Sequence, residues 1–410
     1  MKERVILHCD LNNFYASVEQ VENPNLNAKY LAVAGNTDQR HGIILAKNTL
    51  AKMMGVKTGE PIWQAKQKCP ELVCVLPHYE LYVQYSNAVK DIYKQYTDKI
   101  ESFGMDECWL DVTDCQIFGN GEQIANKLRK EVFDKLGLTI SVGVSFCKVF
   151  AKLGSDMKKP DATTVISKEN FKRKVWPLPI EEMLYVGKQT KTKLNKLGIF
   201  TLQQLALADC QLLQRQLGVN GKKLWQCANG LDDTPVSDVN DAGEIKSVSH
   251  GTTTVKDMTS YAEADRTIEY LSELVATRLR RYGMEGSVVH LTIRRNDLSH
   301  QSHQQVVPRT FVANEILKCA KKLLRQIWNP CTQLPLRSLT VAVAQLEKVS
   351  DAVQCSIFDQ DHEKKQRLEF AIDQIRKRYG FESILLADCV DQDLLIKSTA
   401  EEDMLPFKRK

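Results

Sequence analysis

Residues 103–113, which read FGMDECWLDVT, place two adjacent carboxylates, Asp106 and Glu107, in a run that otherwise favours a β-strand. Asp and Glu disfavour strands, and adjacent residues of a strand face opposite sides of the sheet. One interpretation is that the pair marks a turn or a solvated sheet edge. The other is that a strand meets a tight turn here, so that both side chains converge on something positively charged. The second interpretation needs a partner elsewhere in the chain.

Length and composition define the class of protein. The chain has 410 residues, of which 43% are apolar and 26% are charged, and its net charge is +5. A chain of this length exceeds one hydrophobic core, so about two to four domains are expected. No apolar run approaches the roughly 18 residues of a membrane span, and the apolar run after the charged start is too short for a secretory signal. The sequence therefore predicts a cytoplasmic protein with no membrane partner.

The twelve cysteines are scattered along the chain and form no C-x-x-C pair. This spacing argues against a disulfide framework and against a zinc site. Reduced, buried thiols are expected.

Strands and helices alternate up to about residue 166, which predicts an α/β or α+β core. The first strand ends at Asp10, and a helix with apolar residues at helical spacing follows. Pro177 and Pro179 mark a linker into a helical segment that ends near Val236, and the polar run SDVNDAGE (237–244) marks a second linker. Residues 246–345 follow the order strand, helix, strand, strand, helix, strand, which predicts a two-layer β-α-β-β-α-β domain.

Asp10 is the natural third carboxylate, because ligands bind at the carboxyl ends of strands in α/β sheets. Three acids in proximity need a cation, and all-oxygen ligands favour Mg²⁺ over zinc. Two Mg²⁺ ions about 3.5–4 Å apart can clamp the attacking and leaving oxygens of a phosphoryl transfer. Two rival interpretations of Asp10 exist. A phosphatase nucleophile would need a second acid where the chain has Asn12, and a helix cap near Asn13 would leave Asp106 and Glu107 unexplained.

Three segments resemble, in order and spacing, the motifs of the Y-family translesion DNA polymerases, most closely the bacterial DNA polymerase IV type. They are DLNNFYASVE (10–19), MDECWLDVT (105–113) and SVGVSFCKVFAKLGSDMKKPD (141–161). The resemblance implies an α+β right-hand polymerase, a monomer that adds dNTPs to the 3′-hydroxyl of a primer on template DNA. It also implies error-prone translesion synthesis in DNA damage tolerance, without proofreading.

The domains that this resemblance implies cover the chain. They are a ferredoxin-like palm (1–20 and 76–168), small fingers (21–75), a helix-hairpin-helix thumb (169–236), a β-α-β-β-α-β little finger (243–346) and a C-terminal tail (347–410).

The resemblance also implies the metal ligands of the active site. Asp10 and Asp106 would bind two Mg²⁺ ions, the carbonyl of Leu11 would complete one site, and Glu107 would ligate the catalytic metal near the primer 3′-hydroxyl. A strand context suits these acids, because in-line attack needs metals fixed to fractions of an ångström.

Phe14, Tyr15 and Lys159 match positions that contact the incoming nucleotide in this family. Tyr15 would face the sugar and collide with a 2′-hydroxyl, which is specificity by repulsion. Phe14 and Tyr15 are also candidates for core aromatics of the helix, but adjacent helix positions diverge, so one of the two is expected in the core. Lys159 would reach the triphosphate as a point charge.

The fingers depart from the family pattern. The family has a Tyr and an Arg three residues apart at the triphosphate, where this chain has Thr49 and Lys52. Lys52 keeps the charge without the bidentate fork of arginine. Lys47 is a second candidate for this contact, and for either lysine a solvated surface position is the alternative.

The segment VGKQTKTKLNKLGI (186–199) carries four lysines and no acid. Gly187, Lys188 and Lys191 resemble a helix-hairpin-helix, in which backbone N–H groups bind a DNA phosphate without reading bases. The usual Pro-Gly start is replaced by Leu184 and Tyr185. A plain surface charge run is the alternative.

Arginines of the last folded domain are concentrated in RLRRYG (278–283) and IRRND (293–297). Arg280, Arg281, Arg294 and Arg295 are expected to follow the backbone of the DNA duplex with salt-dependent affinity. For Arg280 and Arg281, stabilisation of a helix dipole is the alternative.

The tail contains QCSIFD (354–359), which resembles the peptide with which bacterial polymerases bind the sliding clamp. Gln354, Ile357 and Phe358 would make this contact. An amphipathic helix follows, with Leu368, Ile372, Ile375 and Tyr379 on one stripe. Two other functions remain possible from the sequence: another two-metal nucleotidyl enzyme on the same palm fold, and a clamp-bound DNA-binding scaffold without catalysis.

Overall fold

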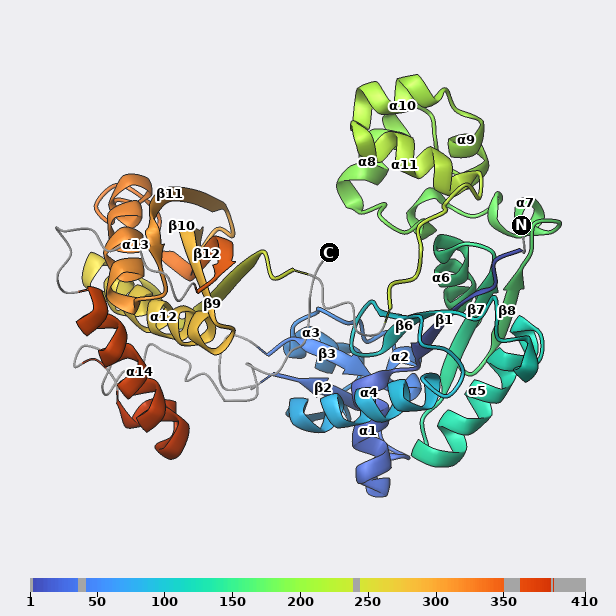
Figure 1. Ribbon diagram of the computed structural model, residues 1–410, viewed down its shortest axis with the longest axis horizontal. Helices are drawn as coiled ribbons and strands as arrows, with labels where there is room; N and C mark the ends of the chain where they lie inside the picture. The colour runs from blue at the N-terminus through green and yellow to red at the C-terminus, as the bar shows by residue number, and fades with distance from the viewer. Residues whose placement is uncertain (1–2, 36–41, 239–243, 350–361, 385, 387–410) are drawn as a thin grey trace. The chain divides into compact units, whose positions relative to one another are not determined.

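The computed structural model describes residues 3–35, 42–238, 244–349, 362–384 and 386. The described chain forms two compact units. The first unit holds the elements from β1 to α11, and the second holds those from β9 onward (Figure 1). Each unit is described separately below.

A five-stranded sheet forms the centre of the first unit. Its strands lie in the order β5 (Ile100–Ser102), β6 (Glu107–Asp111), β1 (Ile6–Leu11), β7 (Ile140–Ser145) and β8 (Thr163–Ile166). β1 pairs antiparallel with both β6 and β7, and β7 pairs parallel with β8. All six residues of β1 are buried, because helices cover both faces of the sheet at this strand.

The two faces of β1 pack against different helices. Leu7, Cys9 and Leu11 belong to the core formed with α1 (Phe14–Glu22), α4 (Tyr79–Tyr93) and α5 (Gly121–Leu136). Ile6 packs with Ala151 of α6 (Lys148–Met157) on the other face. The alternation follows from the two-residue period of a strand, and it places Asp10 on the α6 face.

A glycine allows α6 to lie close to the sheet. A Cβ atom at Gly143 of β7 would stand 1.9 Å from the carbonyl oxygen of Ala151 and 2.6 Å from the backbone nitrogen of Ser155. Only glycine fits such a close approach of two backbones. The central segment of α6 is therefore held directly against β7.

A small second sheet lies in sequence between β1 and β5, with the order β3 (Ile44–Lys47), β2 (Leu31–Ala34), β4 (Val73–Val75). It shares a core with α2 (Thr49–Met53) and α3 (Ile62–Lys68). Helix α2 ends just before Gly55, whose φ is 83°, and α3 follows after this turn.

Short helices make up the rest of the first unit. They are α7 (Phe171–Val175), η3 (Ile180–Glu182), α8 (Lys188–Lys196), α9 (Leu202–Leu207), α10 (Cys210–Leu217) and α11 (Val219–Ala228) (Figure 1). Their apolar residues form one cluster with Phe150 and Leu153 of α6. Helix α6 therefore packs on the sheet with one face and on the helical segment with another.

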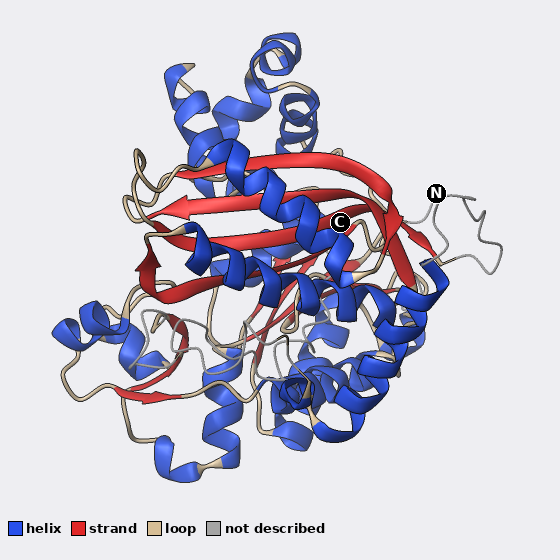
Figure 2. Ribbon diagram, turned by 90° about the vertical axis from the view of Figure 1, so that its left-hand side faces the viewer, coloured by secondary structure: helices blue, strands red, loops and turns tan. Residues whose placement is uncertain are grey.

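The second unit contains a four-stranded antiparallel sheet with the order β11-β10-β12-β9. Its chain order is β9 (Ser247–Met258), α12 (Tyr261–Arg281), β10 (Met284–Arg295), β11 (His300–Thr310), α13 (Ala313–Ile327) and β12 (Leu336–Lys348). Figure 2 shows helices lying across the long strands. One apolar cluster joins α12 and α13 to the sheet, as expected for a two-layer α+β domain.

Helix α14 (His362–Tyr379) also belongs to the second unit, and its charged side contacts α12. Arg280 Nη1 lies 2.6 Å from Glu369 Oε2, and Arg280 Nε lies 2.5 Å from Asp373 Oδ2. The side chain of Arg280 is 1% exposed. The prediction that Arg280 follows DNA is therefore wrong, because this guanidinium is enclosed between two helices.

The apolar stripe of α14 is not its packing face. Leu368 and Tyr379 are 60% and 69% exposed, whereas Glu369 and Arg376 are buried. The helix itself was predicted correctly, and its orientation follows from the ion pairs with α12.

Neither a helix that could cross a membrane nor a cysteine engaged in a disulfide occurs in the described ranges.

Candidate active site

The three predicted carboxylates meet at one end of the five-stranded sheet. Asp10 of β1 is paired in register with Glu107, the first residue of β6. Asp106 directly precedes β6, and its carbonyl oxygen accepts a hydrogen bond from the Leu11 N–H at 2.9 Å. The acidic pair thus lies where a strand leaves a tight turn, as the second interpretation of residues 103–113 predicts.

Burial and mutual repulsion alter the protonation of these acids. Burial, and then the charge of Asp10, raises the pKa of Asp106. Burial likewise raises the pKa of Glu107 to about 7, although Lys152 opposes the shift. For Asp10 burial acts in the same direction, but the charges of Lys152 and Lys159 outweigh it and hold its pKa below the ordinary value. The site therefore favours one ionised carboxylate, Asp10, and makes ionisation of the other two more costly.

Two lysines contact the acids. Lys159 Nζ lies 2.7 Å from Asp10 Oδ2 and 3.0 Å from Asp156 Oδ1. Lys152 Nζ lies 2.7 Å from Glu107 Oε1 and 3.2 Å from Asp10 Oδ2. Burial acts to lower the pKa of Lys152, but Glu107 and Asp10 outweigh it and raise that pKa, so the ammonium is charged.

Lys152 was missed in the sequence, where it is one of several lysines in a basic helix. The sequence offers only the four-residue spacing from Lys152 to Asp156, which puts these two side chains on one face of α6.

His8 is a second residue that the sequence did not reveal. It is fully buried, and its Nδ1 lies 2.9 Å from Ser155 Oγ. The Ser155 hydroxyl donates to the carbonyl of Lys152 at 2.7 Å, so Nδ1–H of His8 is the donor to Ser155. Burial and Lys152 lower the pKa of His8 well below its ordinary value, which keeps the ring neutral. His8 thereby joins β1 to α6 beside the acids.

The donor set fits a hard divalent cation. Asp10, Asp106 and Glu107 supply carboxylate oxygens, and the Leu11 carbonyl lies in the same strand as Asp10. Oxygen ligands of this kind suit Mg²⁺. Among the residues that the structure describes, no three acidic, His or Cys side chains are already arranged as a metal site. The ammonium groups of Lys152 and Lys159 stand against the carboxylates instead.

Phe14 and Tyr15 diverge at the start of α1. Phe14 is 3% exposed and belongs to the main core. Tyr15 is half-buried and stacks on Tyr82, with ring centroids 4.3 Å apart and planes inclined by 13°. Burial and then Asp106 raise the pKa of Tyr15 to about 12, so its ring lies near the acids. The prediction that one of the two aromatics belongs to the core is confirmed for Phe14.

Lys47 and Lys52 lie close together beside the second sheet. Lys52 is exposed on α2, and Lys47 Nζ donates to Thr58 Oγ1 at 2.9 Å. Burial and then the charge of Lys52 lower the pKa of Lys47. The nearby Asn13 Nδ2 donates to Thr49 Oγ1 at 3.2 Å, which joins α2 to the start of α1.

The lysine-rich segment forms α8, which begins directly after Gly187. Lys188 is exposed, whereas Lys191 Nζ lies 2.6 Å from Glu181 Oε1. Segment 186–199 contains no acid, so the sequence does not indicate that Lys191 pairs with the 3-10 helix before α8. Tyr185, which replaces the usual glycine, has a φ of 74° and is 67% exposed.

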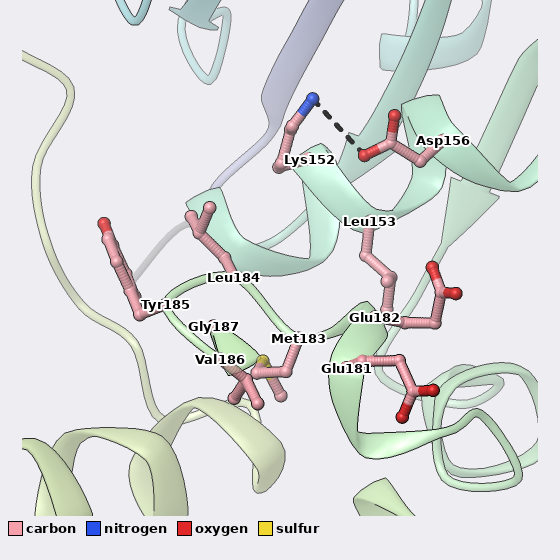
Figure 3. Close-up of a pocket in the computed structure, with 10 residues that line it drawn as sticks. All are labelled: Lys152, Leu153, Asp156, Glu181, Glu182, Met183, Leu184, Tyr185, Val186 and Gly187. Carbon is pink, nitrogen blue, oxygen red and sulfur yellow. Dashed lines mark ion pairs between the residues drawn. The ribbon is translucent and has the colours of Figure 1, made fainter. Parts of the chain in front are cut away.

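A pocket of about 410 Å³ separates α6 from the loop before α8 (Figure 3). Lys152 and Asp156 line it from α6, and Glu181, Tyr185 and Gly187 line it from the other side. The pocket therefore adjoins the carboxylate site through the side chain of Lys152.

In the second unit, Arg294 is exposed and Arg295 is half-buried at the end of β10. Arg295 Nη2 donates to Gln301 Oε1 at 2.8 Å. Gln354, Ile357 and Phe358 lie outside the described residues.

Two protein-family comparisons match this chain. Residues 9–156 match the impB/mucB/samB family, and residues 245–357 match the C-terminal domain of that family. A protein named DNA polymerase IV from Acetivibrio thermocellus is 45% identical over 387 residues, which cover 93% of this chain and 96% of that protein. DNA polymerase IV 2 of Bacillus subtilis is 34% identical and covers 94% of this chain and 95% of its own length.

Solved structures agree at the level of the fold. A chimeric Y-family DNA polymerase superposes with a TM-score of 0.75 at 24% identity, covering 84% of this chain and all of that one. DinB from Sulfolobus solfataricus gives a TM-score of 0.54 at 24% identity, covering 83% of this chain and 98% of its own.

Proposed function

This chain belongs to the impB/mucB/samB family of Y-family DNA polymerases and is a translesion DNA polymerase, and we propose that Asp10, Asp106 and Glu107 carry its nucleotidyl transfer. The observation behind this proposal is the register of Asp10 with Glu107, with Asp106 adjacent, at one end of a buried sheet. Y-family polymerases depend on metal ions. Here the proposed ions are two Mg²⁺, held by the three carboxylates and the Leu11 carbonyl.

The residues of the chain prepare this reaction by position and charge. Mg²⁺ bound at the acids would bring the primer 3′-hydroxyl and the α-phosphate together and stabilise the charge that develops between them. β1 and β6 fix Asp10 and Glu107 in register, so the ligands are arranged before substrate arrives. Lys159, next to Asp10, would contact the triphosphate as a point charge.

Tyr15 is the proposed sugar-facing aromatic. Its ring is supported from one side by Tyr82, and its hydroxyl lies 3.4 Å from Met105 Sδ. A ring held in this way cannot move aside for a 2′-hydroxyl, so it would exclude ribonucleotides by collision. The buried Phe14 would contact a nucleotide through its backbone only.

Lys52 and Lys47 are the proposed fingers contacts to the triphosphate. Their proximity supports this role, since two ammonium groups that repel each other attract a polyanion strongly. Lys52 is exposed and would be able to reach the triphosphate, whereas Lys47 donates a hydrogen bond to Thr58.

The proposed domains follow the right-hand arrangement: palm (1–20 and 76–168), fingers (21–75), thumb (169–236), little finger (243–346) and tail (347–410). Gly187, Lys188 and Lys191 would bind a DNA phosphate in the thumb, and Arg294 and Arg295 would do so in the little finger. Lys191 would first have to leave Glu181. The protein is proposed to act as a cytoplasmic monomer that binds the sliding clamp through Gln354, Ile357 and Phe358.

Two substitutions test the catalytic assignment. Asp106→Asn and Glu107→Gln should each slow primer extension roughly a thousandfold or more, because a lost metal ligand removes several kcal/mol of transition-state stabilisation. Primer–template binding should be nearly unchanged, because the proposed DNA contacts are lysines and arginines of the thumb and little finger.

Glu122→Gln on the exposed surface of α5 is the matched control and should extend primers like the parent protein. A non-catalytic scaffold would behave identically in all three variants, and equal extension by parent and Glu107→Gln would refute the assignment.

A further inference from the structure

Lys152 stands among three carboxylates at once. Its Nζ lies 2.7 Å from Glu107 Oε1, 3.2 Å from Asp10 Oδ2 and 3.3 Å from Asp156 Oδ2. The side chain is only 13% exposed, so water screens these interactions little. Two of these oxygens belong to residues that the proposed function assigns to the metal.

The position of Lys152 conflicts with a bound cation. An ammonium and a divalent ion cannot occupy the space between Asp10 and Glu107 together, because both are positive and both use the same oxygens. The backbone of α6 cannot withdraw to resolve this conflict. Gly143 leaves no gap beneath the helix, and the Nδ1 of His8, 2.9 Å from Ser155 Oγ, joins the helix to β1.

Lys152 has a third carboxylate partner that is not a proposed metal ligand. Asp156 lies one turn further along α6, is 40% exposed and lines the pocket next to Lys152 (Figure 3). Residues four apart on a helix face each other, so Lys152 can keep this partner without help from the sheet. Rotation about the side-chain bonds is sufficient for the exchange.

We propose that Lys152 is an internal counter-ion that holds Asp10 and Glu107 together before metal binds, and that it moves onto Asp156 when Mg²⁺ takes their oxygens. This inference rests on the proposed metal site. It makes Lys152 a positioning residue with two opposite effects. The lysine stabilises the metal-free protein, and it weakens the first binding of metal by competing for the ligands.

The test uses the full-length protein and two readouts that do not depend on catalysis. Mn²⁺ binding is titrated by electron paramagnetic resonance, and the melting temperature is measured in EDTA and in saturating Mg²⁺. Lys152→Met keeps the length of the side chain and removes its charge. It should bind Mn²⁺ roughly tenfold more tightly, the scale on which one nearby charge alters cation affinity. Its melting temperature should fall in EDTA and return toward that of the parent in Mg²⁺.

Asp156→Asn should have the opposite effect on the metal. Without its partner at position 156, Lys152 remains on Asp10 and Glu107, so Mn²⁺ affinity should decrease. Lys148→Met is the matched control, because Lys148 is also a partly enclosed lysine of α6 but pairs with Glu101 at 2.7 Å. It should lower the melting temperature equally in both conditions and leave Mn²⁺ affinity unchanged.

The outcomes separate this inference from the proposed function. If Asp106→Asn abolishes Mn²⁺ binding while Lys152→Met binds like the parent, the counter-ion role is refuted and the metal site stands. If Asp106→Asn binds Mn²⁺ like the parent, the metal assignment fails and the role of Lys152 fails with it. A melting temperature of Lys152→Met that Mg²⁺ does not restore would also refute the inference, because it would indicate a purely structural lysine.

Discussion

At the scale of single residues, adjacent side chains of α1 have separate tasks. Phe14 fills the core, whereas Tyr15 presents a ring that Tyr82 supports from behind. Tyr15→Ala should therefore allow ribonucleotides to be added while dNTP insertion is largely kept, because the collision disappears and the carboxylates are unaffected. Single-nucleotide insertion with matched rNTP and dNTP measures the ratio.

Two further variants serve as controls for this prediction. Tyr15→Phe keeps the ring and should discriminate like the parent. Phe14→Ala should instead lower the free energy of unfolding by about 3–5 kcal/mol, the cost of deleting a buried aromatic. Loss of sugar discrimination in Phe14→Ala with none in Tyr15→Ala would show that the sugar-facing residue is Phe14.

Residue patterns in the sequence pointed to the carboxylates and to Lys159, but not to Lys152. Asp106 and Glu107 are conspicuous because acids are rare inside strands. Lys152 is inconspicuous because lysines are ordinary on helices, and only the register of α6 on β7, set by Gly143, brings it to the acids. Tyr185 has a positive φ that no residue pattern indicates, because tyrosine rarely adopts it.

At the scale of elements, ion pairs join α14 to α12, whereas helices usually pack through apolar contacts. Arg280→Met would leave Glu369 and Asp373 enclosed without their partner, and should lower the free energy of unfolding of the second unit by about 3–5 kcal/mol. Urea denaturation followed by circular dichroism measures the loss, and hydrogen exchange should show that α14 is the helix released.

An exposed ion pair of the same unit provides the control variant for Arg280→Met. Arg309 pairs with Glu347 on the surface, and Arg309→Met should change the free energy of unfolding by less than about 1 kcal/mol. Equal effects of the two substitutions would mean that enclosure adds nothing to the Arg280 contacts.

Element order was predictable from the sequence, and helix orientation was not. The strand and helix periods of residues 246–345 appear in the structure as β9, α12, β10, β11, α13 and β12. The stripe of Leu368 and Tyr379 suggested an apolar face, yet these side chains remain exposed. The face that packs is decided by Arg280, almost ninety residues away, and a local period carries no information about such a partner.

At the scale of the whole molecule, the two units have separate cores, and the proposed clamp peptide lies outside the described residues. Replacing Gln354, Ile357 and Phe358 with Ala should leave extension of a short primer–template unchanged and abolish stimulation by a loaded clamp on long templates. Two buried apolar side chains would contribute roughly 1.5–3 kcal/mol each, which supports weak binding that tethering would make effective. Full stimulation of the triple variant would place the clamp contact elsewhere on the chain.

The glycine at position 143 limits which substitutions the protein can tolerate near the carboxylates. Gly143 has no side chain with which to bind a metal or a nucleotide, yet the lack of a Cβ sets the distance between β7 and α6. Any larger residue would lift the helix and carry Lys152 away from the acids. Shifts of about 1 Å can cost a hundredfold in rate. Variation around the proposed catalytic carboxylates is thus limited by a residue that has no reactive group.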